Sequence, residues 1–214
     1  MKSISAYKNQ ALGSLKGCWG DSVIITLIYI VVTLVFSSSL SVVGNLLEAH
    51  FTSIASLLIL PIGWGYIVYF LNLARKENIG KNTLFDGFHS KEYVRVLGTI
   101  LLYNLLIAIG FVLLIVPGII LSLMYSQFLF ILKDNPEMKY MAALKLSAKM
   151  MKGHLWQFFL LNLSFIGWVL LALLTFGIGM LWLEPYIYTT WAHYYEDLKE
   201  EYEAMTAPVV ETLE

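Results

Sequence analysis

The most restrictive feature of this sequence is a stretch of 36 residues, Leu97 to Leu132, that contains no charged side chain. A transmembrane helix needs about 20 mostly apolar residues. The stretch is therefore too long for one span and has the length of two spans joined by a tight turn. Pro117 and Gly118 interrupt it, and both residue types favour a turn. The pattern predicts a hairpin of two spans, residues 97–116 and 119–132, that turns at Pro117–Gly118.

The composition agrees with lipid as the main solvent of the chain. Hydrophobic residues make up 58% of the 214 residues, charged residues 14%, and the mean hydropathy is +0.71. An ordinary globular domain is about 45–50% apolar and about 25% charged. A soluble fold of this size cannot bury so much apolar surface. The net charge of −1 gives no indication of a nucleic-acid partner.

Four more apolar segments predict four further spans, which lie at residues 22–46, 54–73, 156–174 and 180–194. The first of these continues beyond the length of a signal peptide and is interpreted as a retained helix. A second tight turn at Phe176–Gly179 joins the last two spans. Because the spans at 119–132 and 180–194 are short, re-entrant hairpins remain an alternative to full crossings.

The basic residues predict the orientation of these six spans. All 14 lysines and arginines lie before the first span, between the second and third, between the fourth and fifth, or after the sixth. None lies in the three loops on the opposite side. Basic loops stay in the cytoplasm. The sequence therefore predicts that both termini lie in the cytoplasm.

The predicted hairpins resemble one another and indicate an internal repeat. Their turns read LPIGWG, VPGII and TFGIG. We expect an all-α integral membrane fold in which residues 1–198 form one six-span domain of three parallel hairpin units. The units cover about residues 1–76, 77–134 and 135–198, and an acidic tail, 199–214, prolongs the last helix in its first half. Parallel units differ from the inverted repeats of many secondary transporters.

Two amphipathic helices are expected on the cytoplasmic side. Asp134–Glu137 resembles a helix start with an asparagine cap, and this helix should run to Lys152. Its apolar side comprises Met141, Leu144, Ala148 and Met151. The N-terminal segment forms the other helix, with an apolar side of Ile4, Tyr7, Ala11, Leu15 and Cys18. We expect five lysines to contact anionic lipid headgroups or a protein partner: Lys145, Lys149, Lys152, Lys8 and Lys16.

Polar residues inside the predicted spans are the candidates for a ligand or transport site. Glu184 is the only charged residue within a span, beside Pro185 and Tyr186. It is either a neutral or paired structural carboxyl or a site for a proton, a cation or an amine. Asn104 and Asn162 occupy matching places in two spans and either hydrogen-bond between helices or line a cavity. Tyr186 and Tyr125 are further candidates for its wall.

No motif for catalysis or for metal binding is present. The sequence has no HExxH, Walker loop or GxSxG. Its four histidines are scattered without metal-ligand spacing, and its single cysteine, Cys18, cannot form a disulfide within the chain. We expect no metal, no cofactor and no enzymatic activity.

The second half of the chain resembles an uncharacterised bacterial membrane family, domain of unknown function 975. The segments that carry this resemblance are IVPGIILSLMYSQFLFILKDNPE, AALKLSAKMMKGHLWQFFLLNLSFIGWVLLALLTFGIG and EPYIYTTWAHYYEDL. The first half is similar through LKGCWGDSVIITLIY and LFDGF. The chain is also distantly similar to the membrane portions of glycerophosphodiester phosphodiesterases, without their catalytic domain. The family resemblance implies a six-span inner-membrane protein and no particular activity.

Two functions follow as hypotheses. The first is a non-enzymatic membrane protein that binds lipid or a membrane or cytoplasmic partner, through its basic amphipathic helices. The alternative is a small transporter or channel component with a polar cavity around Glu184. An enzyme that acts on lipid is a weaker third hypothesis.

Overall fold

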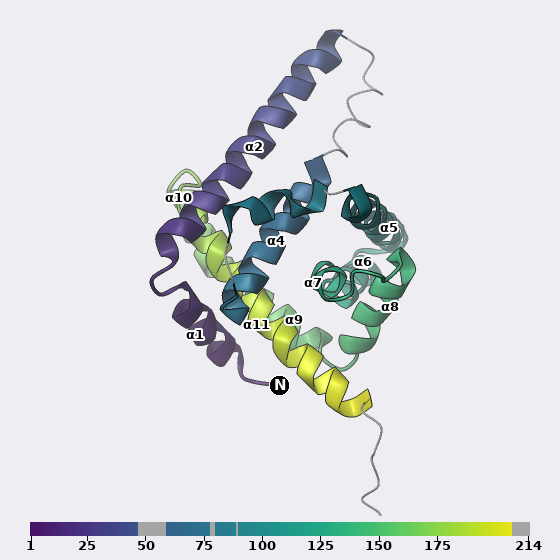
Figure 1. Ribbon diagram of the computed structural model, residues 1–214. Coiled ribbons are helices and arrows are strands. Elements are labelled where there is room, and N and C mark those ends of the chain that lie inside the picture. The colour runs from purple at the N-terminus through teal and green to yellow at the C-terminus, as the bar shows by residue number, and fades with distance from the viewer. Residues whose placement is uncertain (47–58, 78–79, 89, 207–214) are drawn as a thin grey trace, which may run out of the picture.

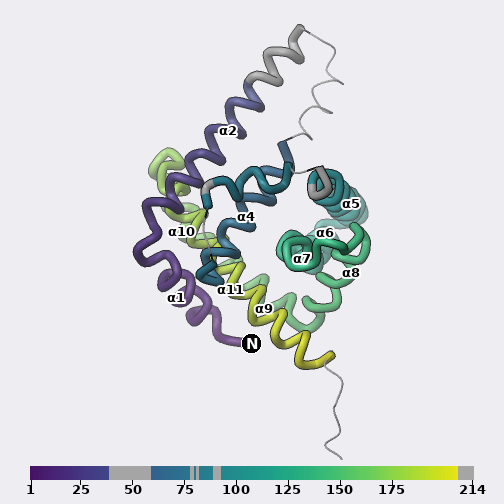
Figure 2. Tube along the Cα trace, viewed as in Figure 1, coloured from purple at the N-terminus to yellow at the C-terminus, as the bar shows by residue number. Residues whose placement is uncertain are grey.

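The computed structural model describes residues 1–46, 59–77, 80–88 and 90–206, and within these ranges the regular elements are all helices. Figure 1 shows their arrangement, and Figure 2 traces the same path as a tube. The helices in chain order are α1 (Ile4–Leu15), α2 (Trp19–Leu46), α4 (Leu60–Arg75), the 3₁₀ helix η2 (Lys81–Phe88), α5 (Ser90–Leu113), α6 (Ile115–Met124), α7 (Phe128–Asp134), α8 (Tyr140–Met150), α9 (Leu155–Leu163), α10 (Ile166–Leu174) and α11 (Met180–Thr206).

Four helical segments are long and apolar enough to cross a membrane. They are Trp19–Ser38, Tyr93–Leu113, Ile115–Asp134 and Leu155–Leu174. The prediction of an all-helical fold is therefore confirmed for the described residues, and the four segments are compatible with a membrane protein. The predicted spans at 54–73 and 180–194 fall on α4 and α11, which are not among the four segments. Residues 54–58, the polar segment before them and the last eight residues lie outside the described part of the chain.

The helices α4 and α11 lie at the centre of the molecule. In Figure 1, α1, α2 and α10 lie on one side of this pair and α5 to α8 lie on the other. The pair also supplies much of the two buried clusters, including the fully buried Tyr66, Phe70, Tyr194 and Tyr195. Figures 1 and 2 show α5 and α7 end-on while α2, α4 and α11 run across the picture. The α5–α7 hairpin therefore runs at a large angle to α4 and α11.

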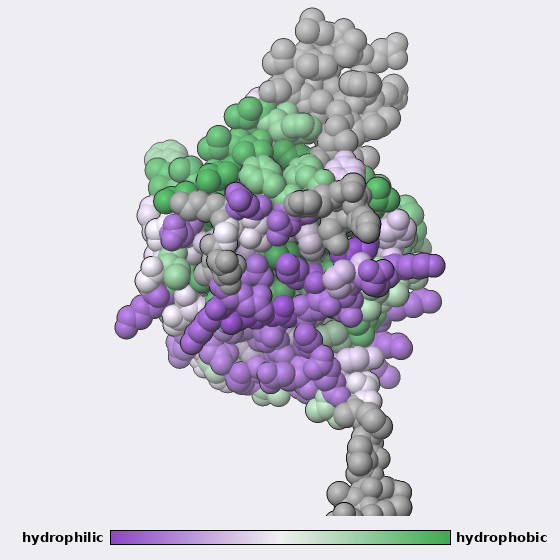
Figure 3. Space-filling view, viewed as in Figure 1, coloured by the Kyte–Doolittle hydropathy of each residue, from purple (hydrophilic) through white to green (hydrophobic). Residues whose placement is uncertain are grey.

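The surrounding helices expose apolar side chains on their outer surface. Val112 is 85% exposed at the end of α5, and Phe176 is 100% exposed in the turn before α11. Such side chains are compatible with lipid contact. In Figure 3, hydrophilic residues cover the lower part of this face, near the N-terminus and the end of α11, whereas the described part of α2 above them is hydrophobic.

The turn of the hairpin predicted for residues 97–132 lies at a different place from the one expected. The chain reverses at Leu114, which has φ −167° and ψ 156° and caps α6. Pro117 lies in the first turn of α6, where a missing N–H removes no helical hydrogen bond. Gly118 packs so closely on α5 that a Cβ atom there would lie 2.6 Å from the Phe111 ring. The Pro-Gly pair thus begins a helix, and the prediction of a turn there was wrong.

The second predicted turn is confirmed. Residues 175–179 form turns between α10 and α11, and Phe176 and Gly177 have φ values of 54° and 84°. Two predicted spans are each divided, however, at Tyr125–Gln127 and at Ser164–Phe165. At each break a serine hydroxyl donates to the carbonyl three residues earlier: Ser126 to Leu123 at 2.8 Å, and Ser164 to Leu161 at 2.6 Å. Serine commonly competes with the helical ladder in this way.

The amphipathic helices are present with one correction. The face predicted for α1 is confirmed, since Tyr7, Ala11 and Leu15 are buried. Helix α8 begins at Tyr140 rather than near Asn135, because the Asn135 side chain instead bonds back to the Ile131 carbonyl at the end of α7. Of its predicted apolar side, Leu144 and Met151 are buried and Ala148 is half-buried, whereas Met141 is exposed. The predicted apolar side is therefore confirmed in part, and Ala143, Ser147 and Met150 complete the buried side.

Candidate functional site

A cavity of about 380 Å³ lies between the central helices and their neighbours. Residues of α2, α4, α5, α6, α7, α9 and α11 contribute to its wall. The wall is largely aromatic, with Tyr29, Trp64, Tyr66, Tyr103, Tyr188 and Trp191 among its members. Ligand pockets of small molecules have volumes of about 300–1,000 Å³ and are mostly apolar with a few polar groups. The cavity therefore has the size and the chemistry of a binding site.

The polar side chains of the cavity wall carry amides, hydroxyls and indoles. Asn104 of α5 and Asn162 of α9 both line it, together with Ser122 and Ser126. The Asn162 Nδ2 donates to the Phe158 carbonyl at 2.7 Å. The Trp191 Nε1 is buried and has no hydrogen-bond partner in the described structure. None of the described residues around the cavity is an Asp, Glu, Lys, Arg or His.

A hydrogen-bonded chain connects three helices beside the cavity. The Tyr66 hydroxyl of α4 donates to Glu184 Oε2 of α11 at 3.1 Å and lies 2.9 Å from Thr26 Oγ1 of α2. The Tyr29 ring stacks on Tyr66 with 4.4 Å between ring centroids. Thr26 Oγ1 is also 2.8 Å from the Ser22 carbonyl. Glu184 is thus held next to the aromatic wall without forming part of the cavity surface.

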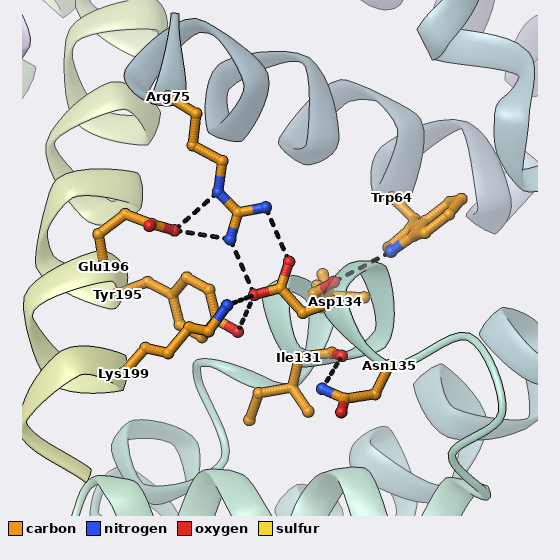
Figure 4. Close-up of polar contacts among 9 residues, drawn as sticks. Trp64, Arg75, Ile131, Asp134, Asn135, Tyr195, Glu196 and Lys199 are labelled. Carbon is orange, nitrogen blue, oxygen red and sulfur yellow. Dashed lines mark hydrogen bonds and ion pairs between the residues drawn. The ribbon is translucent and has the colours of Figure 1, made fainter. Parts of the chain in front are cut away.

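Toward the C-terminal ends of α4, α7 and α11, an ionic cluster joins the helices (Figure 4). Arg75 Nη1 and Nη2 donate to the two carboxylate oxygens of Asp134, each at 2.8 Å. The same guanidinium donates to Glu196 Oε1 through Nε at 2.9 Å and Nη2 at 2.7 Å. Tyr195 and Lys199 donate to Asp134 Oδ2 at 2.9 and 2.7 Å. We call these five residues, Arg75, Asp134, Tyr195, Glu196 and Lys199, the ionic cluster.

The ionic cluster is largely buried, and its charges balance. The side chains of Arg75 and Asp134 are only 17% and 10% exposed. Burial alone would lower the pKa of the Arg75 guanidinium, but its hydrogen bonds to Asp134 and Glu196 outweigh burial and raise that pKa above its usual value. Arg75 therefore stays charged. A bidentate arginine–carboxylate pair is among the strongest and most directional polar contacts in proteins.

An aromatic pair separates the cavity from the ionic cluster. Phe130 of α7 lines the cavity and stacks on Tyr195 of α11 with 5.1 Å between ring centroids. Both side chains are nearly fully buried. Tyr195 then reaches Asp134 with its hydroxyl. The ring pair therefore lies between this part of the cavity wall and the fixed charges of the ionic cluster.

The structure brings together some of the predicted ligand residues and separates others. Asn104 and Asn162 line the same cavity, and Glu184 lies beside it behind Tyr66. Tyr186 instead packs against Phe165 and lines a second, apolar cavity of about 440 Å³ between α1, α2, α10 and α11. Tyr125 caps the end of α6 and packs on the core without lining the central cavity.

The predicted lysines also fall into two groups. Lys145, Lys149, Lys152 and Lys16 are exposed. Lys8 turns inward to the break between α9 and α10, where its Nζ donates to the Ser164 carbonyl at 3.0 Å and lies 4.2 Å from the Phe165 ring centroid. Burial lowers the pKa of Lys8.

Sequence reasoning missed the ionic cluster. Its members are up to 124 positions apart in the sequence. They lie close to or beyond the ends of predicted spans, where charged residues are expected in any membrane protein. One signal was available: only two of the 14 basic residues are arginines, Arg75 and Arg95. Both lie at a helix end, and Arg95 donates to the Leu132 and Asn135 carbonyls at the end of α7. Arginine is preferred where several donors must be fixed at once.

Comparison with known proteins gives one positive result. A family model described as a protein of unknown function (DUF975) matches residues 1–120 and 105–202. No curated protein and no solved structure matches the chain, and the distant similarity to glycerophosphodiester phosphodiesterases finds no support in these comparisons. Since the two matched segments cover nearly the whole chain, this protein belongs to the DUF975 family.

Proposed function

We propose that this protein is a six-span protein of the bacterial inner membrane that binds a lipid or another amphipathic molecule between its helices and performs no chemistry on it. The cavity carries the proposal. Its aromatic wall suits an apolar body, and its two asparagines suit a single polar group. The non-enzymatic part rests on the lack of a recognisable catalytic motif in the sequence.

The proposed topology is supported by contacts between the termini. The N-terminal amine lies 3.3 Å from Glu201 Oε2, and Lys2 Nζ lies 2.5 Å from Asp197 Oδ1, both on α11. The ends of α4 and α7 and the C-terminal half of α11 meet in the ionic cluster. This is expected if the second, fourth and sixth spans all leave the membrane on one side. The concentration of lysines there favours the cytoplasm.

The exposed lysines support a second contact with lipid. Lys145 and Lys149 lie on the exposed side of α8, and Lys152 follows in the next turn. We propose that they contact anionic headgroups of the inner leaflet, to which each lysine near the surface contributes about 1 kcal/mol. Replacing all three with glutamine should lower the recovery of anionic lipid with the purified protein. If a protein partner is lost instead and lipid recovery is unchanged, α8 is a docking site.

Native mass spectrometry of protein gently extracted from its membranes tests the cavity. We expect one amphipathic molecule per chain. Gly63→Leu should displace it, because Gly63 lines the cavity and an added Cβ would touch only the Tyr29 hydroxyl, at 3.7 Å. Gly167→Leu is the matched control, since Gly167 lies on the exposed side of α10 with open space around it. Equal occupancy in both variants would contradict binding in the cavity.

Transport is the second candidate, and the ionic network beside the cavity favours it. One part of the wall adjoins the Glu184–Tyr66–Thr26 chain, and another adjoins Phe130, Tyr195 and the ionic cluster. A transporter must open its site to the two sides of the membrane alternately. Ser126→Cys, in a Cys18→Ser background, places a thiol on the cavity wall. Asp134→Asn should speed its labelling from the cytoplasmic side by a membrane-impermeant reagent. Unchanged labelling would count against a gate at the ionic cluster.

A further inference from the structure

We infer that the central cavity selects an electrically neutral amphiphile, with one extended apolar portion and one hydroxyl, ester or amide group. This inference rests on the proposed function, because it assumes that the cavity holds a ligand. It specifies a class that neither the family nor the motif content of the sequence indicates.

The described wall of the cavity has no charged side chain that could pair with an ionic ligand. Glu184 is the nearest acid along the wall, and it already accepts a hydrogen bond from Tyr66. Arg75, beyond Phe130 and Tyr195, is engaged by two carboxylates. Burying an ion without a partner costs several kcal/mol. A carboxylate or phosphate group would therefore enter without a counter-ion, and an ammonium group would have only the faces of the aromatic rings as partners.

The polar atoms of the wall define what the ligand must offer. Asn104 and Asn162 each present an amide, which both donates and accepts hydrogen bonds. The Trp191 Nε1 is a buried donor without a partner in the described structure, so a ligand oxygen reaches it once the indole turns toward the cavity. Trp191 packs on Phe158, whose carbonyl holds Asn162, so indole and amide belong to one region of the wall. A hydroxyl, ester or amide oxygen satisfies both.

The volume limits the ligand to a single chain or a small ring system. The cavity of about 380 Å³ lies at the low end of the range of about 300–1,000 Å³ for small-molecule pockets. A phospholipid with two acyl chains is much larger. A fatty alcohol or a short isoprenoid alcohol fits, and the aromatic rings of Tyr29, Tyr66 and Tyr188 provide flat surfaces for its chain.

Three probes with the same twelve-carbon chain test this inference. The protein is placed in nanodiscs of a zwitterionic lipid, and binding of 1-dodecanol, of laurate at pH 9 and of dodecyltrimethylammonium is measured by quenching of tryptophan fluorescence with brominated analogues. We expect the neutral probe to bind at least ten-fold more tightly than either ion. Trp191→Phe should weaken binding of the neutral probe two- to ten-fold. Trp182→Phe is the control, because Trp182 is half exposed and does not line this cavity.

The outcomes distinguish a failure of ligand binding in the cavity from a failure of the preference for a neutral ligand. If either ion binds as tightly as the neutral probe, and Gly63→Leu still abolishes that binding, the cavity holds a ligand but the neutral class is wrong. If none of the three probes binds, the proposed function fails and this inference fails with it. If the neutral probe binds but Trp191→Phe has no more effect than Trp182→Phe, the assignment of the polar end to Trp191 is wrong.

Discussion

The central cavity and the ionic cluster lie between the same helices, about one helical turn apart, and have opposite chemistry. The described wall of the cavity contains no charged residue and leaves one indole N–H without a partner. The ionic cluster contains four charged side chains, and Asp134 alone accepts four hydrogen bonds. The difference shows that fixed charges join α4, α7 and α11 in the ionic cluster, whereas the described wall of the cavity is neutral.

Physical chemistry explains this separation. A buried ion pair is stable only when its remaining hydrogen-bonding groups are satisfied, because removing ions from water is unfavourable. Arg75 meets this condition with bonds from three of its nitrogen atoms to Asp134 and Glu196. Neutral polar groups such as Asn104 carry a smaller penalty and can remain exposed to a cavity. The two regions therefore respond differently to substitution.

The largest effect is expected from Asp134→Ala. This change leaves Arg75 with Glu196 alone and deprives Lys199 of its acceptor. Breaking a buried ion pair by removing one partner destabilises a protein by about 3–5 kcal/mol. We expect thermal unfolding in detergent, followed by tryptophan fluorescence, to occur at a clearly lower temperature. Glu203→Ala, on the exposed side of α11, should leave the transition almost unchanged.

The double variant Arg75→Met with Asp134→Leu sharpens the interpretation. It removes both members of the bidentate pair and leaves Glu196 and Lys199, which are three residues apart on α11 and can pair. Because well-packed apolar residues often replace a buried ion pair without loss, we expect the double variant to be more stable than Asp134→Ala. A double variant that is less stable than the single one would contradict the view that unpaired charge causes the loss.

The next prediction compares the stability of variants at two glycines on α4. A Cβ at Gly65 would lie 2.3 Å from the Leu84 carbonyl oxygen of η2, whereas Gly63 faces the cavity. Gly65→Ala should destabilise the protein by about 1–3 kcal/mol, because backbone atoms must move. Gly63→Ala should stabilise it by roughly 0.5–1 kcal/mol, since alanine favours the helix and the space is available. Equal unfolding temperatures for the two variants would mean that η2 does not pack on α4 as described.

A smaller effect is expected at Lys8, the one predicted lipid-contact lysine that turns inward. Lys8→Met keeps the apolar stem but loses the bond to the Ser164 carbonyl and the contact with the Phe165 ring. A hydrogen bond to a charged group contributes about 1.5–3 kcal/mol, and relief of burying the ammonium offsets part of this. We expect a loss of about 1 kcal/mol in the same unfolding measurement. Lys16→Met, at an exposed position, should change little; a larger loss there would indicate that Lys16 is also bound.

Much of the fold was predictable because it depends on local composition. The 36 uncharged residues from Leu97 to Leu132 require a hairpin in any apolar solvent, and the periodic face of α1 can be read residue by residue. The turn at Phe176–Gly177 was predicted because glycine adopts a left-handed backbone without strain. Asn104 and Asn162 were identified as candidates because amides within spans are rare and need partners.

The remainder depends on contacts that no local pattern encodes. Proline and glycine can end a helix or begin one, and only the approach of α6 to Phe111 places Pro117–Gly118 at a beginning. Serine tolerates a continuous helix, so the breaks at Ser126 and Ser164 were not expected. The ionic cluster required knowing that α4, α7 and α11 converge. A charged residue at a span end is otherwise expected to contact water or headgroups.

The smallest effect on stability should come from the indole donors, and it tests the comparison most directly. Trp64 and Trp191 both line the cavity, but Trp64 Nε1 donates to the Leu129 carbonyl at 3.0 Å while Trp191 Nε1 has no partner in the described structure. Trp64→Phe should lose about 0.5–1.5 kcal/mol and leave the carbonyl without its donor. Trp191→Phe removes only an unsatisfied group, so ligand-free protein should be equally stable or slightly more stable. If Trp191→Phe destabilises the ligand-free protein as much as Trp64→Phe does, the Trp191 indole is already bonded within the protein. The polar end of the cavity would then be part of the scaffold rather than a place for a ligand.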